Sequence, residues 1–96
     1  MRAFRNYIPP SPAALANFKA DTGLTGNQLA DLLGLADGRQ WRKYTGGADP
    51  RTMSPAMLFA LATRFEIDDA TLDRIVARMR AIGASFDFLD PEATPE

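Results

Sequence analysis

Apolar residues recur at helical spacing in five separate runs along this chain. Leu15 and Phe18 stand three residues apart in the first run, and Leu29 and Leu33 stand four apart in the second. The last two runs carry the longest stripes, which are Leu58, Leu61, Ala62 and Phe65, and then Leu72, Ile75, Val76, Met79 and Ile82. Because residues three or four positions apart share one face of an α-helix, each run predicts a helix with one buried stripe.

Capping residues and glycines bound the first two runs. Ser11 followed by Pro12 is typical of an N-cap and a first helical residue, and Gly23 predicts the end of that helix. Thr25 and Gln28 have the spacing of a capping box, in which two side chains satisfy each other's backbone donors. These signals predict two short helices in close succession.

The later helices are bounded in the same way. Gly34 ends the second helix, and Asp37 with Gln40 repeats the capping-box spacing at the start of a third that runs to about Thr45. The remaining boundaries are Gly46-Gly47, Ser54-Pro55, Asp68 or Asp69, and Gly83. Residues 48–53 contain a proline and no periodicity, which predicts a loop.

The two ends of the chain show a different, alternating pattern. Phe86 and Phe88 share a face of one short segment, and Phe4 and Ile8 do so near the start. Such alternation predicts short strands that pair with each other or across a dimer. We therefore expect an all-α protein, a compact five-helix bundle with a short terminal β-strand pairing. The expected divisions are an arm or strand at 1–10, a helical domain at 11–84, and a short strand with an acidic tail at 85–96.

Composition excludes several kinds of chemistry. The chain has 96 residues, enough for one core, and it contains no cysteine and no histidine. Disulfides, thiolate zinc sites and histidine-based catalysis are therefore excluded. No phosphate-binding glycine loop and no set of metal-ligating residues is recognisable either, so we expect neither an enzyme nor a cofactor or metal site. The first residues lack the apolar run of a signal peptide, and we expect a soluble, cytoplasmic protein.

Charge is distributed unevenly about a net charge of −1. Residues 1–51 carry a net charge of +3, whereas residues 52–96 carry −4. An overall neutral chain can still bind a polyanion when its cations are confined to one region.

The third predicted helix, at 37–45, concentrates cations on one side. At 100° per residue, Trp41 and Tyr44 define an inward side. The opposite side and its flanks carry Arg39, Arg42 and Lys43, with Gln40 at the boundary. Arginine can bond guanine and glutamine can bond adenine through paired hydrogen bonds in the major groove. A solvated face above an aromatic core side is the alternative interpretation, because exposed helices carry lysine and arginine routinely.

The segment 25–47 resembles the helix-turn-helix of the Cro and lambda-repressor-like family, the xenobiotic-response-element type of bacterial and phage regulators. The matching positions are the cap Thr25, Ala30, the turn Gly34-Leu35, Trp41, Tyr44 and the closing Gly47. Residues 54–65 resemble the helix that follows in this family, and the whole resemblance covers about 13–66. A small residue at Ala30 lets the two helices cross, and Gly34 takes a backbone angle that is costly for other residues.

The resemblance implies roles for the residues of the helix-turn-helix, at about 25–46. The implied base-reading residues are Arg39, Gln40, Arg42 and Lys43. The implied phosphate contacts are Thr25, Asn27 and Gln28. Arg51 and Thr52, in the loop after the third helix, are further candidates for a phosphate contact, and a solvated loop is the alternative interpretation. Ala30, Gly34, Leu35, Trp41 and Tyr44 are the implied structural positions.

The chain departs from the family pattern at two points. Seven steps separate Gly34 from Trp41, where the family has six, and we expect Gly38 to absorb the additional residue. Gly26 stands where the family has a phosphate-binding glutamine, and Asn27 or the backbone amides at that helix end are the expected substitutes.

These features predict a transcriptional regulator, a repressor that binds a double-stranded DNA operator. The resemblance is compatible with an origin in a phage, a plasmid or a mobile element. A homodimer is expected, because one recognition helix reads too few base pairs for specificity in a genome. The candidate dimer residues are Phe86, Phe88, Met79 and Ile82. One alternative is an antitoxin that also binds its operator and an unknown protein partner. A second is a helical interaction module without DNA binding.

Overall fold

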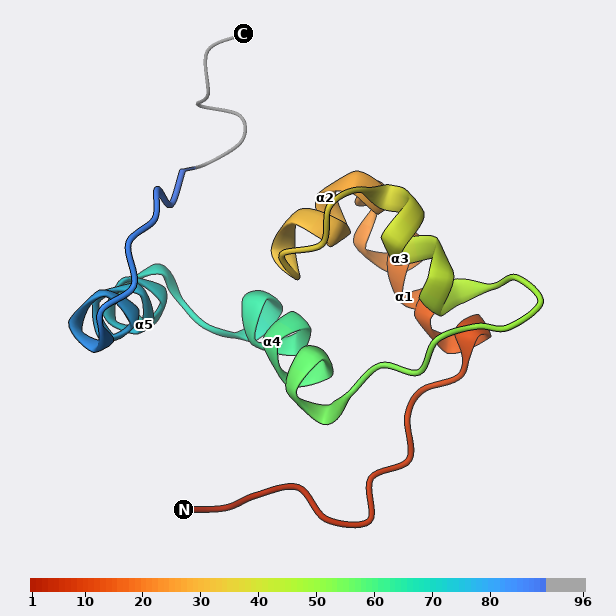
Figure 1. The fold of residues 1–96 in the computed structure, drawn as a ribbon, viewed down its shortest axis with the longest axis horizontal. Helices are drawn as coiled ribbons and strands as arrows, with labels where there is room; N and C mark the ends of the chain where they lie inside the picture. Colours follow the sequence, from red (N-terminus) through yellow and green to blue (C-terminus); the bar gives the residue numbers. More distant parts are fainter. Residues whose placement is uncertain (90–96) are drawn as a thin grey trace, which may run out of the picture. The chain divides into compact units, whose positions relative to one another are not determined.

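The computed structural model describes residues 1–89, and the chain divides after Glu66 into two compact units. The first unit, Met1–Glu66, contains α1 (Pro12–Thr22), α2 (Gly26–Leu32), α3 (Gly38–Thr45) and α4 (Pro55–Glu66) (Figure 1). The second unit begins at Ile67 and contains α5 (Asp69–Ile82). The division lies inside the range 11–84 that the sequence assigns to one domain.

The all-α class is confirmed, but the terminal strands are not, since no strand occurs within residues 1–89. Near the start, the ring of Phe4 packs edge-on against Phe59 at 5.9 Å, and Asn6 adopts a left-handed backbone angle of 54°. Near the end, Phe86 lies against the Arg80 guanidinium at 4.7 Å. The alternating aromatic residues are thus used to pack against helices rather than to face a sheet.

Side-chain caps begin the helices where the sequence predicts them. The Ser11 hydroxyl accepts a hydrogen bond from the Ala14 amide at 3.1 Å, and Pro12 is the first residue of α1. At α2, the Thr25 hydroxyl accepts from the Gln28 amide, and the Gln28 side chain accepts from the Thr25 amide at 2.9 Å. The capping box predicted for α2 is therefore confirmed.

The caps of α3 and α5 are carboxylates. Asp37 accepts from the Arg39 and Gln40 amides at 3.0 and 3.3 Å, as the first half of the predicted capping box requires. Asp68, rather than Asp69, caps α5 by accepting from the Thr71 amide at 2.8 Å. Hydrogen bonding to Thr71 lowers the pKa of Asp68, because it favours the charged form.

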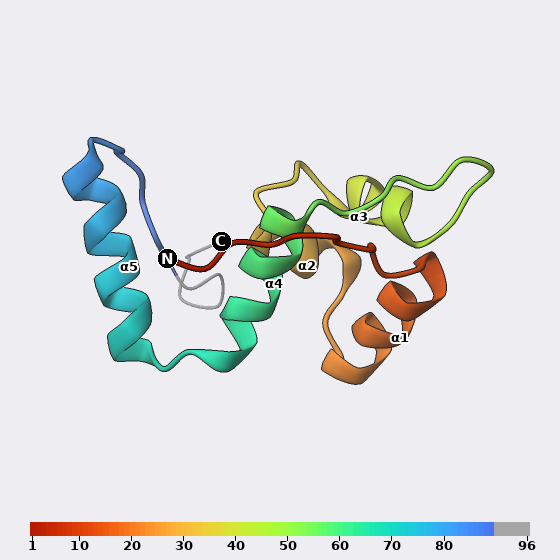
Figure 2. The ribbon, with the colours of Figure 1, turned by 90° about the horizontal axis from the view of Figure 1, so that it is seen from below.

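The core of the first unit is built from all four of its helices and one loop. Its buried members are Leu15, Leu29, Ala30, Trp41, Tyr44, Met53 and Leu61. Figure 2 shows α2 and α3 as neighbours, in agreement with Figure 1, and α1 also packs against α3. Packing against α1 and α2 therefore buries one side of α3 and leaves its other side exposed.

The predicted stripes of α4 and α5 are only partly buried. Leu61 is buried and Leu58 is half-buried, but Ala62 is exposed and Phe65 packs at the surface against Phe18. The helix predicted from this stripe is present, and its four positions differ in burial. In α5, Val76 is buried and much of the remaining stripe is exposed.

A hydrogen bond and a ring contact tie the N-terminal arm to the rest of the first unit. The Tyr7 hydroxyl donates to the Met53 carbonyl at 2.7 Å, and Met53 itself is buried in the core. Figure 2 shows the arm passing α4, where Phe4 meets Phe59. The arm therefore ties the loop before α4 to the start of the chain.

Candidate nucleic-acid interface

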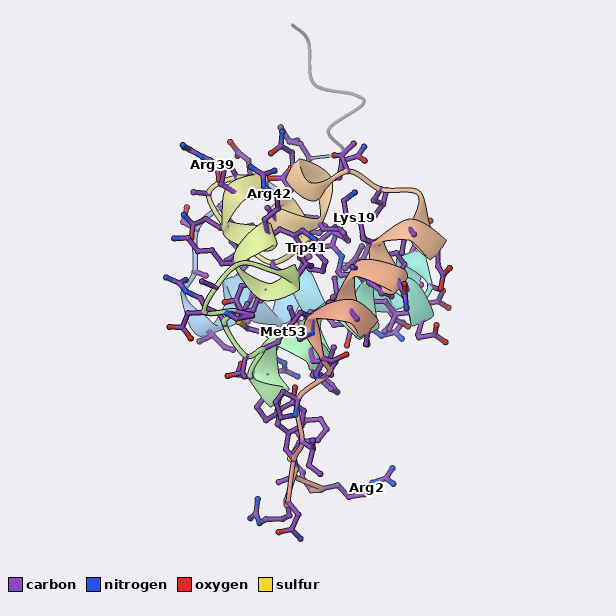
Figure 3. All side chains as sticks on the ribbon, turned by 90° about the vertical axis from the view of Figure 1, so that its right-hand side faces the viewer. Arg2, Lys19, Arg39, Trp41, Arg42 and Met53 are labelled. Carbon is purple, nitrogen blue, oxygen red and sulfur yellow. The ribbon has the colours of Figure 1, made fainter. Side chains whose placement is uncertain are left out.

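The two sides of α3 differ sharply in exposure and chemistry. Trp41 and Tyr44 are 1% and 7% exposed, so their predicted inward orientation is confirmed. The exposed residues of the other side are Arg39, Arg42 and Lys43, with Gln40 half-buried between the two sides. Figure 3 shows Arg39 at the edge of the view, Arg42 over α3, and Trp41 nearer the middle. The eight-residue helix α3 therefore exposes three cations on one side, and its opposite side is buried in the core.

Contacts on the inner side hold α3 in place. The Tyr44 hydroxyl donates to the Met57 sulfur at 3.5 Å, which joins α3 to α4. The Trp41 ring lies close to Gly26, where a Cβ atom would stand 3.7 Å from Cδ1 of the indole. The indole nitrogen has no hydrogen-bond partner among the described residues, so its burial carries a desolvation cost. The indole nitrogen is buried because the Trp41 ring packs tightly among apolar groups of the core.

The first turns of α2 and α3 touch through a glycine. The Gly38 amide donates to the Asn27 side-chain oxygen at 2.7 Å. A Cβ atom on Gly38 would lie 2.8 Å from that oxygen and 3.1 Å from the Asn27 backbone nitrogen. Gly38 is thus required by close approach of the two helices, which is a more specific role than the slack expected from the sequence.

The turn between α2 and α3 is organised around the end of α2. The Leu35 amide donates to the Ala30 carbonyl at 2.8 Å, and Gly34 adopts the left-handed angle of 70°. Ala30 is 1% exposed, and Leu35 packs partly buried against the core. The small residue and the left-handed glycine therefore occupy the places that the sequence predicts for them.

An ion pair lies at the start of the cationic face. The Arg39 guanidinium donates to the Asp37 carboxylate at 3.1 Å, and both side chains are accessible to solvent. The hydrogen bond from Arg39 is the main cause that lowers the pKa of Asp37, assisted by the Gln40 and Arg39 amides. The carboxylate therefore caps α3 and also positions the guanidinium of Arg39, which the capping pattern alone does not indicate.

The candidate phosphate-binding residues lie at two places. Thr25, Asn27 and Gln28 are exposed at the start of α2, where the amide oxygens of Asn27 and Gln28 already accept backbone hydrogen bonds. Their NH2 groups are the donors left for an anion. Arg51 and Thr52 are exposed in the loop after α3, and the Arg51 amide donates to the Lys43 carbonyl at 2.7 Å. That bond folds the loop back against the end of α3.

One further cation lies on a helix that packs against α3. Lys19 is half-buried in the last turn of α1, which packs against α3. Figure 3 places Lys19 in the same half of the view as Arg39 and Arg42, and Arg2 at the opposite end. Sequence reasoning missed Lys19 because no spacing rule relates α1 to α3; its signal is a basic residue shortly before the Thr25 cap.

The candidate dimer residues all belong to the second unit. Met79, Ile82 and Phe88 are exposed, whereas Phe86 is half-buried beneath Arg80. The Arg80 guanidinium also donates to the Phe86 carbonyl at 3.2 Å. The segment after α5 is therefore folded onto the last turns of that helix.

No family model, curated protein or solved structure matches the chain. Within residues 1–89, none of the helices has the length and apolarity needed to cross a membrane.

Proposed function

We propose that the chain is a sequence-specific regulator that binds double-stranded DNA, a repressor that occupies an operator as a dimer. The observation that carries this proposal is the two-sided character of α3. Trp41 and Tyr44 are buried, and the exposed side carries Arg39, Arg42 and Lys43. A short helix that packs on the core through one side and exposes cations on the other has the dimensions and chemistry to bind in the major groove.

Base reading is assigned to the exposed side chains of α3. Arg39 and Arg42 can each form paired hydrogen bonds with guanine, and Gln40 can do so with adenine. Lys43 supplies a third cation to the same surface. The ion pair with Asp37 limits the directions open to the Arg39 guanidinium, which favours one base position over many.

Phosphate binding is assigned to the flanks of α3. The donors at the start of α2 and those of Arg51 and Thr52 lie on segments that adjoin this helix. Contacts of this kind position a protein on the duplex without reading its sequence. Two half-sites about 34 Å apart, read by two copies, would supply the specificity that one short helix lacks. Occupancy of such a site in a promoter blocks transcription.

The proposal is tested by selecting bound sequences from random double-stranded DNA with the full chain. We expect one enriched sequence with two related halves. Affinity for it, measured by fluorescence anisotropy at fixed salt, should fall at least about tenfold in Arg42→Ala, as expected for a lost paired contact to guanine. Arg74→Ala removes the same charge from an exposed position on α5 and is the matched control.

Failure to enrich any sequence would refute the proposal and favour a helical interaction module. Equal losses in Arg42→Ala and Arg74→Ala would refute the assignment to α3. A toxin-like partner bound together with the operator would identify the chain as an antitoxin, which retains the DNA site proposed here.

A further inference from the structure

The N-terminal arm, residues 1–10, and α4 border an open cavity that the proposed DNA contacts do not use. It has a volume of about 660 Å³ and is lined by Arg2, Ala3, Phe4 and Phe59. Phe4 and Phe59 are 56% and 60% exposed, and their rings meet edge-on at 5.9 Å. The volume lies in the range of small-molecule sites, and more than half of each aromatic residue is left uncovered for an incoming group.

The surroundings of this cavity are positively charged. The arm contains two arginines and no acidic residue, and α4 has a single acid, Glu66, at its last position. The Arg5 guanidinium donates to the Phe4 carbonyl at 2.8 Å, which keeps this cation beside the cavity. The Arg2 guanidinium has no hydrogen bond or ion pair in the part of the chain that the structure describes. Figure 3 shows the Arg2 side chain extending outward from the arm. The charge at the rim therefore favours an anion.

The two kinds of side chain at the cavity favour a ligand that is both aromatic and anionic. A third ring can extend the edge-on packing of Phe4 and Phe59, since aromatic rings prefer edge-to-face or offset contacts. A guanidinium binds a carboxylate through two parallel hydrogen bonds, a geometry that an ammonium group cannot match. We propose that the arm and α4 form a binding site for a small aromatic carboxylate, with its ring against the two phenylalanines and its carboxylate on Arg2.

Contacts on both sides of Asn6 hold the arm in the shape that borders the cavity. Asn6 has a left-handed backbone angle of 54°, which asparagine adopts more readily than most residues. Before this bend, the Phe4 ring packs on α4, and after it, the Tyr7 hydroxyl donates to the Met53 carbonyl at 2.7 Å. A ligand bound against Phe4 therefore stabilises the arm and, through Tyr7, the loop that contains Met53.

The same loop contacts the proposed DNA-binding helix. The Arg51 amide, two residues before Met53, donates to the Lys43 carbonyl at 2.7 Å. Occupancy of the cavity should therefore stabilise the position of Arg51 and strengthen DNA binding, a consequence that rests on the function proposed above. Because such coupling is reciprocal, bound DNA should strengthen ligand binding by the same factor.

Titration of the isotope-labelled full chain with naphthoate, followed by nuclear magnetic resonance without DNA, tests the site. We expect a dissociation constant of about 1 mM or below, since an open site leaves part of a small ligand in water. The largest amide shifts should occur at Ala3, Phe4 and Phe59. Naphthamide lacks the charge and cyclohexanecarboxylate lacks the aromatic ring, so each should bind at least about threefold more weakly.

Matched substitutions distinguish this site from non-specific adsorption. Phe59→Ala and Arg2→Gln should each weaken naphthoate binding about fivefold or more, because they remove the ring contact and the charged hydrogen bonds. Arg2→Gln should leave naphthamide binding unchanged. Phe65→Ala removes another exposed ring from α4, and Arg74→Gln removes another exposed arginine, so both should bind naphthoate as the wild-type chain does. The amide spectrum of each variant checks that it is folded.

Equal binding of the three compounds would overturn the proposal, as would amide shifts spread over α5 instead of the arm. Equal losses of naphthoate binding in Phe59→Ala and Phe65→Ala would also overturn it.

The coupling to DNA is measured separately, as operator affinity with and without saturating naphthoate. Affinity should rise about threefold or more in the wild-type chain. It should stay constant in Tyr7→Phe, which retains the cavity but loses the hydrogen bond to Met53. An operator bound equally with and without naphthoate would refute the coupling and leave the proposed DNA binding standing. Naphthoate bound at the arm by a chain that prefers no DNA sequence would leave the site standing without that function.

Discussion

At the scale of single residues, the proposed base-reading side of α3 depends on the carboxylate of Asp37 as well as on its cations. Asp37 caps α3 and pairs with Arg39 at 3.1 Å, so this carboxylate favours one direction of the Arg39 guanidinium. A guanidinium fixed in advance loses less conformational freedom when it meets a base. Selectivity at this position should therefore depend on both residues.

Arg39→Ala should weaken binding to the selected operator by about 1–3 kcal/mol and should change binding to random DNA much less, because a base contact exists only on the correct sequence. Arg51→Ala should weaken binding to both DNAs by a similar factor, because a phosphate contact is independent of sequence. Anisotropy titrations with the two DNAs at one salt concentration measure both effects. Equal losses on the two DNAs for Arg39→Ala would contradict a base-reading role.

Asp37→Asn should keep the cap of α3, since asparagine is an equally good N-cap residue. It removes a negative charge beside the DNA and releases Arg39, so binding to random DNA should strengthen more than binding to the operator. The ratio of the two affinities should therefore fall. Thermal unfolding provides the control, and a ratio that stays constant would show that the ion pair does not orient Arg39.

At the scale of elements, the packing of α2 on α3 depends on one glycine. The Gly38 amide and its missing side chain allow Asn27 to approach closely. Gly26 faces the same junction, but a Cβ atom there would stand at an ordinary 3.5 Å from the nearest atom, the Gly38 Cα. The two glycines should therefore differ greatly in their tolerance of substitution.

Gly38→Ala should destabilise the first unit by about 1–3 kcal/mol, because the added methyl group displaces Asn27 and breaks its hydrogen bond. Gly26→Ala is the matched control and should be neutral or slightly stabilising, since alanine favours a helix more than glycine does. Chemical denaturation of the two variants measures the difference. Equal stability would mean that the junction relaxes without cost.

Local signals in the sequence predict much of this architecture. Ser11, Thr25 and Asp37 act on backbone groups within four residues, so their spacing is sufficient to predict the caps. The contact between Gly38 and Asn27 was not predictable, because it depends on how two helices approach one another. The short alternation of apolar and polar residues at Phe86 and Phe88 gave a wrong prediction of a strand. A ring that packs against Arg80 and a ring on one face of a strand produce the same sequence pattern.

At the scale of the whole molecule, charge is divided along the chain. The net charge is +3 over residues 1–51 and −4 over the remainder. The proposed interface draws all its cations from the first part, so the overall value of −1 says little about attraction to DNA. Acidic residues elsewhere limit unspecific adhesion to polyanions.

Binding should weaken steeply as salt increases, with a slope of about −0.9 in log affinity against log salt for each phosphate neutralised. Arg51→Ala should make that slope shallower by about one unit. Titrations at four or more salt concentrations measure the slope. A response without salt dependence would exclude the phosphate contacts assigned here.

The buried indole has a practical consequence for studying the two units separately. Trp41 is the single tryptophan of the chain and lies in the first unit. Its fluorescence emission should be blue-shifted in the native state and should move to the red only when that unit opens, whereas far-ultraviolet dichroism records every helix. Transitions that coincide by the two probes would indicate one cooperative block, and a dichroism change that precedes the emission shift would indicate that α5 melts first.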